Sequence, residues 1–216
     1  MGGDAYRLDI AVEPGARVVV TPASATKVHG MLPGASASQA VTLTVAAGGA
    51  LEYYPGLTIP FPQAEFTQTL DVALAPGARF GMLELWAMGR IERGEYLAFR
   101  RLSSRTTVLL GDRPCYLDAL ELCPAQGRPA GWGVLEGHRY VAVGYWHWED
   151  AVESRDVSRP DLLLVSGVPS CGHLYVRGLA RDGVALRASL QALLGRHRAA
   201  WGLARLSFER YPGILG

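Results

Sequence analysis

The fold is decided by residues 41–54, which read VTLTVAAGGALEYY. In the first five positions, valine and leucine alternate with threonine, which is typical of a strand with one buried face. The glycine pair that follows is typical of a turn, and residues 51–54 then form a second apolar stretch. We therefore expect a strand, a tight turn and a second strand.

The same unit occurs once before and once after this stretch. Residues 6–12 and 18–20 flank the turn EPGA, and residues 70–74 and 80–82 flank the turn APGA. The turn glycines Gly15, Gly49 and Gly77 are 34 and 28 residues apart, a spacing found in stacked repeats that bury their apolar faces against their neighbours. An antiparallel sandwich with similar hairpins fits this spacing equally well. Both alternatives are all-β.

Further strand-like segments lie at 108–110, 140–148, 162–165 and 174–176, and the period then changes to that of a helix. Asp182 is suited to begin this helix and Gly202 to end it. Its apolar face comprises Leu186, Leu190, Leu193, Leu194, His197 and Trp201, and the opposite face, expected to be solvated, carries Arg187, Arg196 and Arg198. We predict a single domain, 1–216, of the all-β class (β-helix-like or layered β-sheets), with a β-rich repeat region, 1–180, and a C-terminal α-helix, 181–202.

Composition argues against several classes of partner. The 21 Lys and Arg residues nearly balance the 20 Asp and Glu residues, so the basic excess typical of nucleic-acid or anionic-membrane binding is missing. No apolar run approaches the roughly 18 residues that span a bilayer. The N-terminus lacks a basic and then apolar signal, and the cysteines show no C-x-x-C spacing. We expect a cytoplasmic protein that binds neither nucleic acid nor membrane.

Known catalytic motifs are missing from the sequence. It has no G-x-S-x-G, P-loop or H-E-x-x-H pattern, and its five histidines are scattered. Cys171 and His173 would share one side of an extended strand, which makes them weak candidates for metal ligands. A buried cysteine beside a surface histidine is the plainer interpretation.

Polar residues within apolar segments are more informative. On a regular strand, Glu84 shares a face with Met82 and Trp86, so its carboxylate must be paired, hydrated or lining a passage. An ion pair with Arg90 is the simplest of these alternatives. Lys27 ends a hydroxyl-rich segment that begins at Thr21 and could equally form a turn that satisfies its own backbone groups.

Four stretches together resemble the ordered motifs of the urease accessory protein family UreD, called UreH in some organisms. These stretches are Gly2-Gly3-Asp4, TPASATK at 21–27, LEYYP at 51–55 with TIPF at 58–61, and GRIERGE at 89–95. Their order and spacing both match, which is more specific than any single motif. The resemblance is close over residues 1–110 and looser beyond.

The resemblance implies a non-enzymatic scaffold with a β-helix-like fold and a pair of C-terminal helices. Members of this family bind UreF, which recruits the GTPase UreG, and dock on the urease apoprotein so that nickel reaches its active site, with a water-filled tunnel proposed through UreD. No cofactor would be held stably, and nickel would be bound only in transit. The residues matched to tunnel or interface roles are Asp4, Thr21, Lys27, Glu52, Glu84, Arg90 and Glu95, with Gly89 and Gly94 as turn formers.

A function of another class is also compatible with the residues. Glu52 and Glu84, with the aromatic residues Tyr53, Tyr54 and Trp86, could serve a small β-fold hydrolase or carbohydrate-binding protein. Co-purification with a UreF-like protein would distinguish the scaffold from this alternative.

Overall fold

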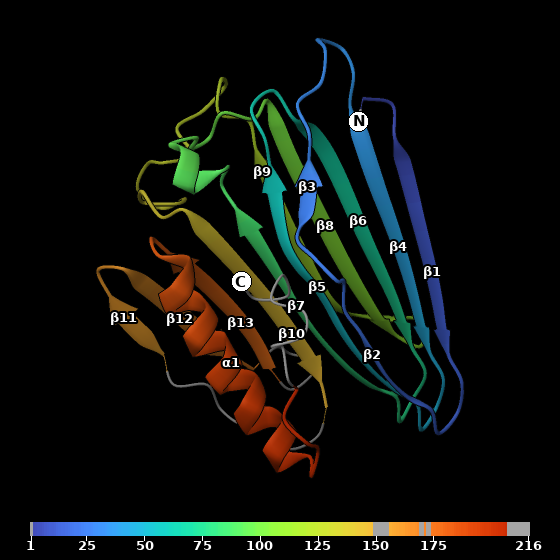
Figure 1. Cartoon of the computed structure of the whole chain (residues 1–216). Helices are drawn as coiled ribbons and strands as arrows, with labels where there is room; N and C mark the ends of the chain where they lie inside the picture. Colours follow the sequence, from blue (N-terminus) through green and yellow to red (C-terminus); the bar gives the residue numbers. More distant parts are fainter. Residues whose placement is uncertain (1, 149–155, 169–170, 172–173, 207–216) are drawn as a thin grey trace.

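The computed structural model describes residues 2–148, 156–168, 171 and 174–206. Within them, strands form two sheets that face each other (Figure 1). Sheet A contains, in spatial order, β1 (Ala5–Val12), β4 (Ala37–Val45), β6 (Glu65–Leu74), β8 (Arg101–Leu110) and β9 (Arg113–Leu122). Sheet B contains β11 (Val157–Arg159), β12 (Leu162–Gly167), β13 (Leu174–Ala180), β10 (Tyr140–His147), β7 (Arg79–Ala87), β5 (Ala50–Pro60) and β2 (Arg17–Val20), with β3 (Thr26–Val28) also beside β5.

The first half of the chain coils between these sheets. From β1 to β8 the chain passes back and forth between sheets A and B, with β2 and β3 both in sheet B, and neighbouring strands in each sheet run parallel. Parallel strands cannot be joined by tight hairpins, so each turn must cross from one sheet to the other. The repeat therefore belongs to a β-solenoid and not to an antiparallel sandwich. The second half extends both sheets with antiparallel strands.

The repeated turns stack along one edge of the solenoid, as the spacing predicted. In each, an amide donates to the carbonyl three residues earlier, as Ala16 does to Glu13 at 3.1 Å. The second turn differs from the prediction by one position, because Gly48 and not Gly49 has the positive φ of +73°. Its amide donates to the carbonyl of Gly77 at 3.2 Å, which joins consecutive coils.

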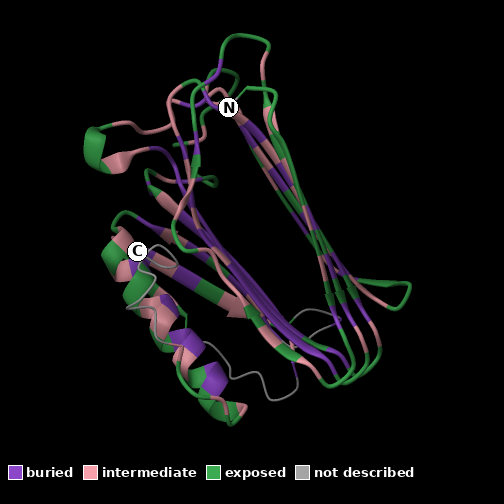
Figure 2. Ribbon diagram, turned by 45° about the vertical axis from the view of Figure 1, so that its right-hand side comes forward, coloured by how far each residue is buried: buried purple, intermediate pink, exposed green. Residues whose placement is uncertain are grey.

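The central strands of sheet B, β5, β7 and β10, are buried on both faces (Figure 2). The inner face of the sheet packs against sheet A, and its outer face is covered by α1 (Gly183–Ala200). Strand β7 accordingly reads as a nearly continuous apolar run, with every residue after Arg79 buried. Within this run, Met82 and Trp86 face the inner core, whereas Leu83 and Leu85 face the helix.

Helix α1 agrees with its predicted position and limits. The Asp182 carboxylate caps it by accepting from the Val184 amide at 2.9 Å, and Gly202 follows its end with a φ of +66°. Among the described residues it is the only α-helix, accompanied by one 3-10 turn, η1 (Ile91–Arg93). None of the helices in this part of the chain is long and apolar enough to cross a membrane. The prediction that Arg198 is solvated is wrong, because its side chain is buried.

Candidate functional site: a polar track between the sheets

A buried carboxylate lies between sheets A and B. Glu84, on β7, is 3 % exposed and shares the inner face with Met82 and Trp86, as its strand position predicted. Its Oε1 accepts from the Gln68 amide at 2.5 Å, and its Oε2 accepts from the Thr106 hydroxyl at 3.3 Å. Both donors come from sheet A, on β6 and β8. The alternative of an ion pair with Arg90 is wrong, because Arg90 binds Glu95.

Burial raises the pKa of Glu84 to about 7, although the hydrogen bonds from Gln68 and Thr106 act in the opposite direction. A carboxylate without a counter-ion is costly in an apolar medium, so burial stabilises the neutral acid relative to the charged form. The side chain is therefore divided between its protonated and charged forms near neutral pH. It can release its proton when a cation replaces it.

Polar side chains extend from Glu84 in both directions across the strands. On one side Gln68 is paired in register with Gln39 of β4, and on the other Thr106 is paired with Asp118 of β9. Asp118 in turn forms an ion pair with Arg177 of β13. The set forms what we call the polar track: Gln39, Tyr53, Gln68, Glu84, Thr106, Tyr116 and Asp118.

Two tyrosines of the track are coupled to the central carboxylate. Burial, with a further contribution from Glu84, raises the pKa of Tyr53 far above its ordinary value and that of Tyr116 to about 12. Tyr116 also stacks on Tyr145, with ring centroids 4.6 Å apart. Both phenols therefore stay neutral at physiological pH and offer hydroxyl oxygens along the track.

One end of the track opens into a pocket of about 490 Å³ beside β1 and β3. Gln39 and Tyr53 of the track line this pocket, together with Asp4, Thr21 and Lys27. Three of the residues that the resemblance assigned to a tunnel or interface are thus brought together at this mouth, although they come from two separate motifs.

Glu52 lies elsewhere, on the outer face of sheet B. It forms a buried ion pair with Arg198 of α1 and accepts from the Tyr54 hydroxyl at 2.8 Å. Arg198 also donates to the carbonyl of Ala204 at 2.6 Å. Glu52 therefore anchors the helix to the sheet. Because Glu52 and Glu84 lie on opposite faces, they cannot act as the paired carboxylates of a hydrolase.

The helix is further held by aromatic side chains on this outer face. His197 is fully buried and stacks on Trp146, with ring centroids 5.1 Å apart. Burial lowers its pKa to about 4, so the imidazole is neutral at physiological pH. Trp201 stacks on Trp148 with ring centroids 4.0 Å apart.

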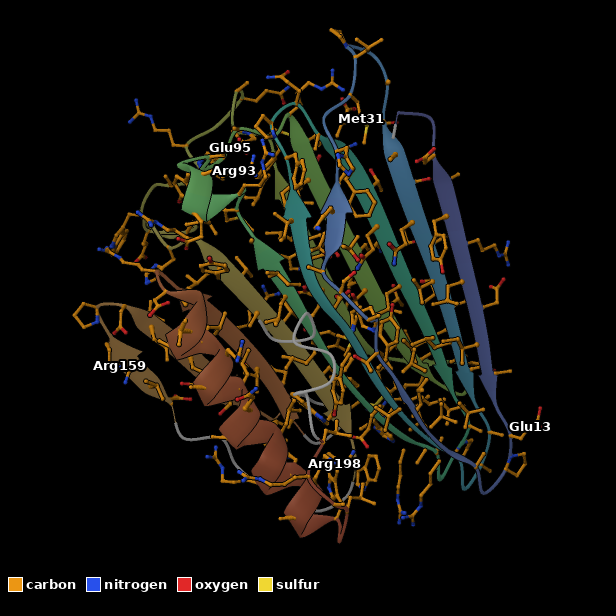
Figure 3. The ribbon with its side chains drawn as sticks, in the orientation of Figure 1. Glu13, Met31, Arg93, Glu95, Arg159 and Arg198 are labelled. Atoms are coloured by element: carbon orange, nitrogen blue, oxygen red, sulfur yellow. A yellow bond between two sulfur atoms is a disulfide. The ribbon has the colours of Figure 1, made fainter. Side chains whose placement is uncertain are left out.

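The charged loop after β7 forms a separate feature (Figure 3). Glu95 accepts two hydrogen bonds from Arg90, which lower the pKa of the Glu95 carboxyl. Gly89 and Gly94 have φ values of +133° and +74°, which side chains with a Cβ rarely adopt. Glu95 and Arg93 lie at the same end of the molecule as Met31, which lines the pocket, and far from Arg198.

The candidate metal ligands at Cys171 and His173 receive no support. The sulfur of Cys171 forms a disulfide with Cys115 of β9, and the cysteine spacing gives no indication of this pair. His173 lies outside the described residues. Across the residues that the structure does describe, no group of three or more His, Cys, Asp or Glu side chains is placed to hold a metal ion.

Sequence reasoning missed the partners of Glu84. Gln68 and Thr106 belong to strands whose alternation of apolar and polar residues is partly visible in the sequence. Gln68 shares the inner face with Leu70, and Thr106 shares it with Val108. A polar residue at an inward position on adjacent strands was therefore a usable signal.

Comparison with known proteins agrees with the motif resemblance. The family model described as "UreD urease accessory protein" matches residues 1–210. "Urease accessory protein UreD 1" of Synechococcus sp. (strain JA-3-3Ab) is 38% identical over 216 residues, covering 100% of this chain and 79% of that protein. "Urease accessory protein UreD" of Deinococcus radiodurans is 35% identical, covering 86% and 68%, and that of Actinomyces naeslundii is 30% identical, covering 98% and 80%. The chain therefore belongs to the UreD urease accessory protein family.

Proposed function

We propose that this chain is a non-catalytic urease maturation scaffold of the cytoplasm. It docks on the urease apoprotein and, together with UreF and UreG, supports the delivery of nickel to the urease active site. Nickel is its cargo and not a resident cofactor. Membership of the UreD family supports the accessory role.

We further propose that nickel passes along the polar track. The observation that carries this step is the buried Glu84 with its Gln68 and Thr106 partners, at the centre of a row of polar side chains between apolar sheets. A transported ion needs oxygen ligands that bind it and also release it. Carboxylate, amide and hydroxyl oxygens hold Ni²⁺ less tightly than thiolates or imidazoles do.

The residues of the track have distinct parts in this proposal. The pocket with Asp4, Thr21 and Lys27 is one mouth of the track, and the Asp118–Arg177 pair lies at its other end, where Asp118 is on β9, the edge strand of sheet A opposite β1. Glu84 exchanges its proton for the divalent ion as the ion passes. Partner docking uses other surfaces, so transport and assembly are separable.

Urease activation in cells that co-express the variants tests the transport step. Glu84→Leu should lower urease activity and urease nickel content at least tenfold, because it removes the carboxylate and leaves an apolar side chain. Glu84→Gln keeps the size and polarity and should impair both less. Asp71→Asn is the matched control, since Asp71 is exposed on the neighbouring strand β6.

A pull-down of UreF and apo-urease shows whether the complex still assembles. The proposal requires normal pull-down with Glu84→Leu. Normal urease activation by Glu84→Leu would refute the transport role. A failed pull-down would mean that Glu84 acts through folding or docking, and the scaffold role itself would be refuted if the unmodified chain captured neither partner.

A further inference from the structure

A disulfide links β9 of sheet A to Cys171, which lies just before β13 of sheet B. Its other sulfur belongs to Cys115, and the two Cα atoms are 4.8 Å apart, within the range that a disulfide bridges without backbone movement. Both cysteines are only 8 % exposed, whereas the third, Cys123, is free and less buried. Strands β9 and β13 belong to different sheets, so side chains hold them together and the disulfide is the covalent contact among these.

A β-bulge explains how the Cys115 side chain reaches sheet B. In the pairing of β8 with β9, Val108 is opposite Tyr116 and Leu109 is opposite Pro114, so Cys115 has no partner in the register. On a regular strand, Cys115 and Tyr116 would face opposite sides. The bulge breaks this alternation, so that Tyr116 packs on the core between the sheets while Cys115 bonds Cys171. Bulges re-aim side chains in this way and are frequent beside functional sites.

The residues next to the disulfide belong to the polar track. Tyr116, which directly follows Cys115, stacks on Tyr145 of β10. The Tyr145 hydroxyl in turn donates to the carbonyl of Cys171 at 3.3 Å. The two ends of the disulfide are therefore also joined through a pair of stacked tyrosines, one of which lines the track. A change at the disulfide is transmitted directly to this end of the track.

An ion that leaves the track at this end must pass Asp118. Its buried carboxylate is paired with the half-exposed guanidinium of Arg177 on β13. While Arg177 stays there, its charge repels a divalent cation and occupies the carboxylate that would bind the ion. Release of Arg177 toward solvent requires room between β9 and β13. The disulfide restricts this room, because it fixes the distance between the two strands.

Disulfides in a reducing compartment are usually transient and redox-sensing, not permanent. We propose that Cys115 and Cys171 form a reversible redox lock on the polar track: the disulfide keeps the Asp118 end closed, and reduction to two thiols opens it to nickel. This inference rests on the proposed nickel delivery in the cytoplasm. Nickel delivery proceeds while the cell is reducing and stops when the two thiols are oxidised.

A dithiol reductant opens the lock by two exchange steps. Its first thiolate attacks one sulfur of the disulfide, forms a mixed disulfide and displaces the other sulfur, which takes up a proton. Its second thiolate then breaks the mixed disulfide and releases the remaining sulfur of the chain, which is also protonated. The chain gains two electrons and two protons, and the reductant leaves as an internal disulfide. Glutathione disulfide drives the reverse reaction and is itself reduced to two thiols.

Two measurements on the purified full chain test the lock without nickel. Alkylation and mass spectrometry after equilibration with glutathione should count three free thiols at the cytosolic ratio of reduced to oxidised glutathione, and one in oxidised glutathione. The matched control, Cys123→Ser, should give two and none. Hydrogen exchange of the β9 amides should become at least about fivefold faster on reduction. A disulfide that persists at the cytosolic ratio, or exchange that reduction leaves unchanged, would overturn the proposal.

Nickel incorporation tests the consequence for transport. Assemblies of the chain with UreF, UreG and apo-urease are reduced with dithiothreitol or oxidised with glutathione disulfide, and are then supplied with nickel ions and GTP. The oxidised wild-type assembly should incorporate at least about fivefold less nickel than the reduced one. Cys171→Ser cannot form the bond, so its oxidised assembly should lose much less. Cys123→Ser is again the control and should show the same difference as the wild type.

The partner proteins are exposed to the same oxidant in every assembly, so the comparison of variants isolates this chain. Equal sensitivity of the wild type and Cys171→Ser to the oxidant would overturn the lock, because the effect would then come from the partners. Equal incorporation by the oxidised and reduced wild type would overturn it as well. If no assembly incorporates nickel, the proposed delivery function fails, and the thiol counts and exchange rates alone decide whether the lock exists.

Discussion

Replacement of Glu84 by glutamine should make the folded protein more stable at alkaline pH and change its stability little at acidic pH. Glutamine is nearly isosteric and can still accept from Gln68, so the packing between sheets A and B is kept. The variant differs from the wild type chiefly in its inability to ionise.

The sign and size follow from the pKa of Glu84. Burial raises it from 4.5 to about 7, so between these values the folded chain holds a proton that the unfolded chain has released. Stability is greatest below the unfolded pKa and is lost as pH rises through the folded pKa. At about 1.4 kcal/mol per pKa unit, the wild type loses about 2.5 kcal/mol between pH 5 and pH 8, and the variant is spared this loss.

Urea denaturation of both proteins at pH 5 and pH 8 measures the difference. With an m value of about 2 kcal/mol per M, the midpoint of Glu84→Gln relative to wild type should move up by about 1 M between these pH values. Glu95→Gln is the control, because Arg90 lowers the Glu95 pKa and the stability that this carboxylate contributes is already complete above pH 4.5, so its loss should be the same at pH 5 and at pH 8. A difference between Glu84→Gln and wild type that is independent of pH would refute the reasoning.

Two other substitutions test the scaffold. Gly77→Val should lower the free energy of unfolding by about 1–3 kcal/mol in urea denaturation. Gly77 has a φ of +79° and open space around it, so the cost is one of backbone strain. Asparagine tolerates positive φ better than valine does, so an equal loss from Gly77→Asn would contradict this explanation. Arg198→Met should lower the free energy of unfolding by about 3–5 kcal/mol, because it leaves Glu52 buried without a counter-ion. Adding Glu52→Gln should recover much of this loss. A double variant whose loss equals the sum of the two single losses would contradict the ion-pair explanation.

The solenoid could be predicted only in part from the sequence. Period-two alternation and the repeated Pro-Gly or Gly-Gly turns identified the strands of each coil. The choice between a coil and a sandwich depended on whether neighbouring strands run parallel or antiparallel. A turn does not determine this, because the next strand can join either the same sheet or the opposite one. The parallel pairing that decides it, such as that of β4 with β6, joins strands of different repeats.

The candidate site could also be predicted only in part from the sequence. Glu84 could be predicted because a carboxylate in an apolar alternation must have a special environment. Its partners come from β6 and β8, so they depend on how sheet A lies over sheet B. Glu52 shows what the sequence pattern could not predict. Its strand, β5, is buried on both faces, so the apolar residues beside Glu52 could not indicate which face it lies on, or that it faces α1 and Arg198.

The two buried carboxylates of sheet B have partners of different charge. Glu52 has a cationic partner, Arg198, and its charge joins the helix to the sheet. Glu84 has neutral partners, and above pH 7 its charge costs the fold about 3 kcal/mol that glutamine would spare. Packing and hydrogen bonding therefore do not explain why position 84 carries a carboxylate. The proposed path for a divalent cation would explain it, because the ion would supply in transit the positive charge that the resting fold lacks.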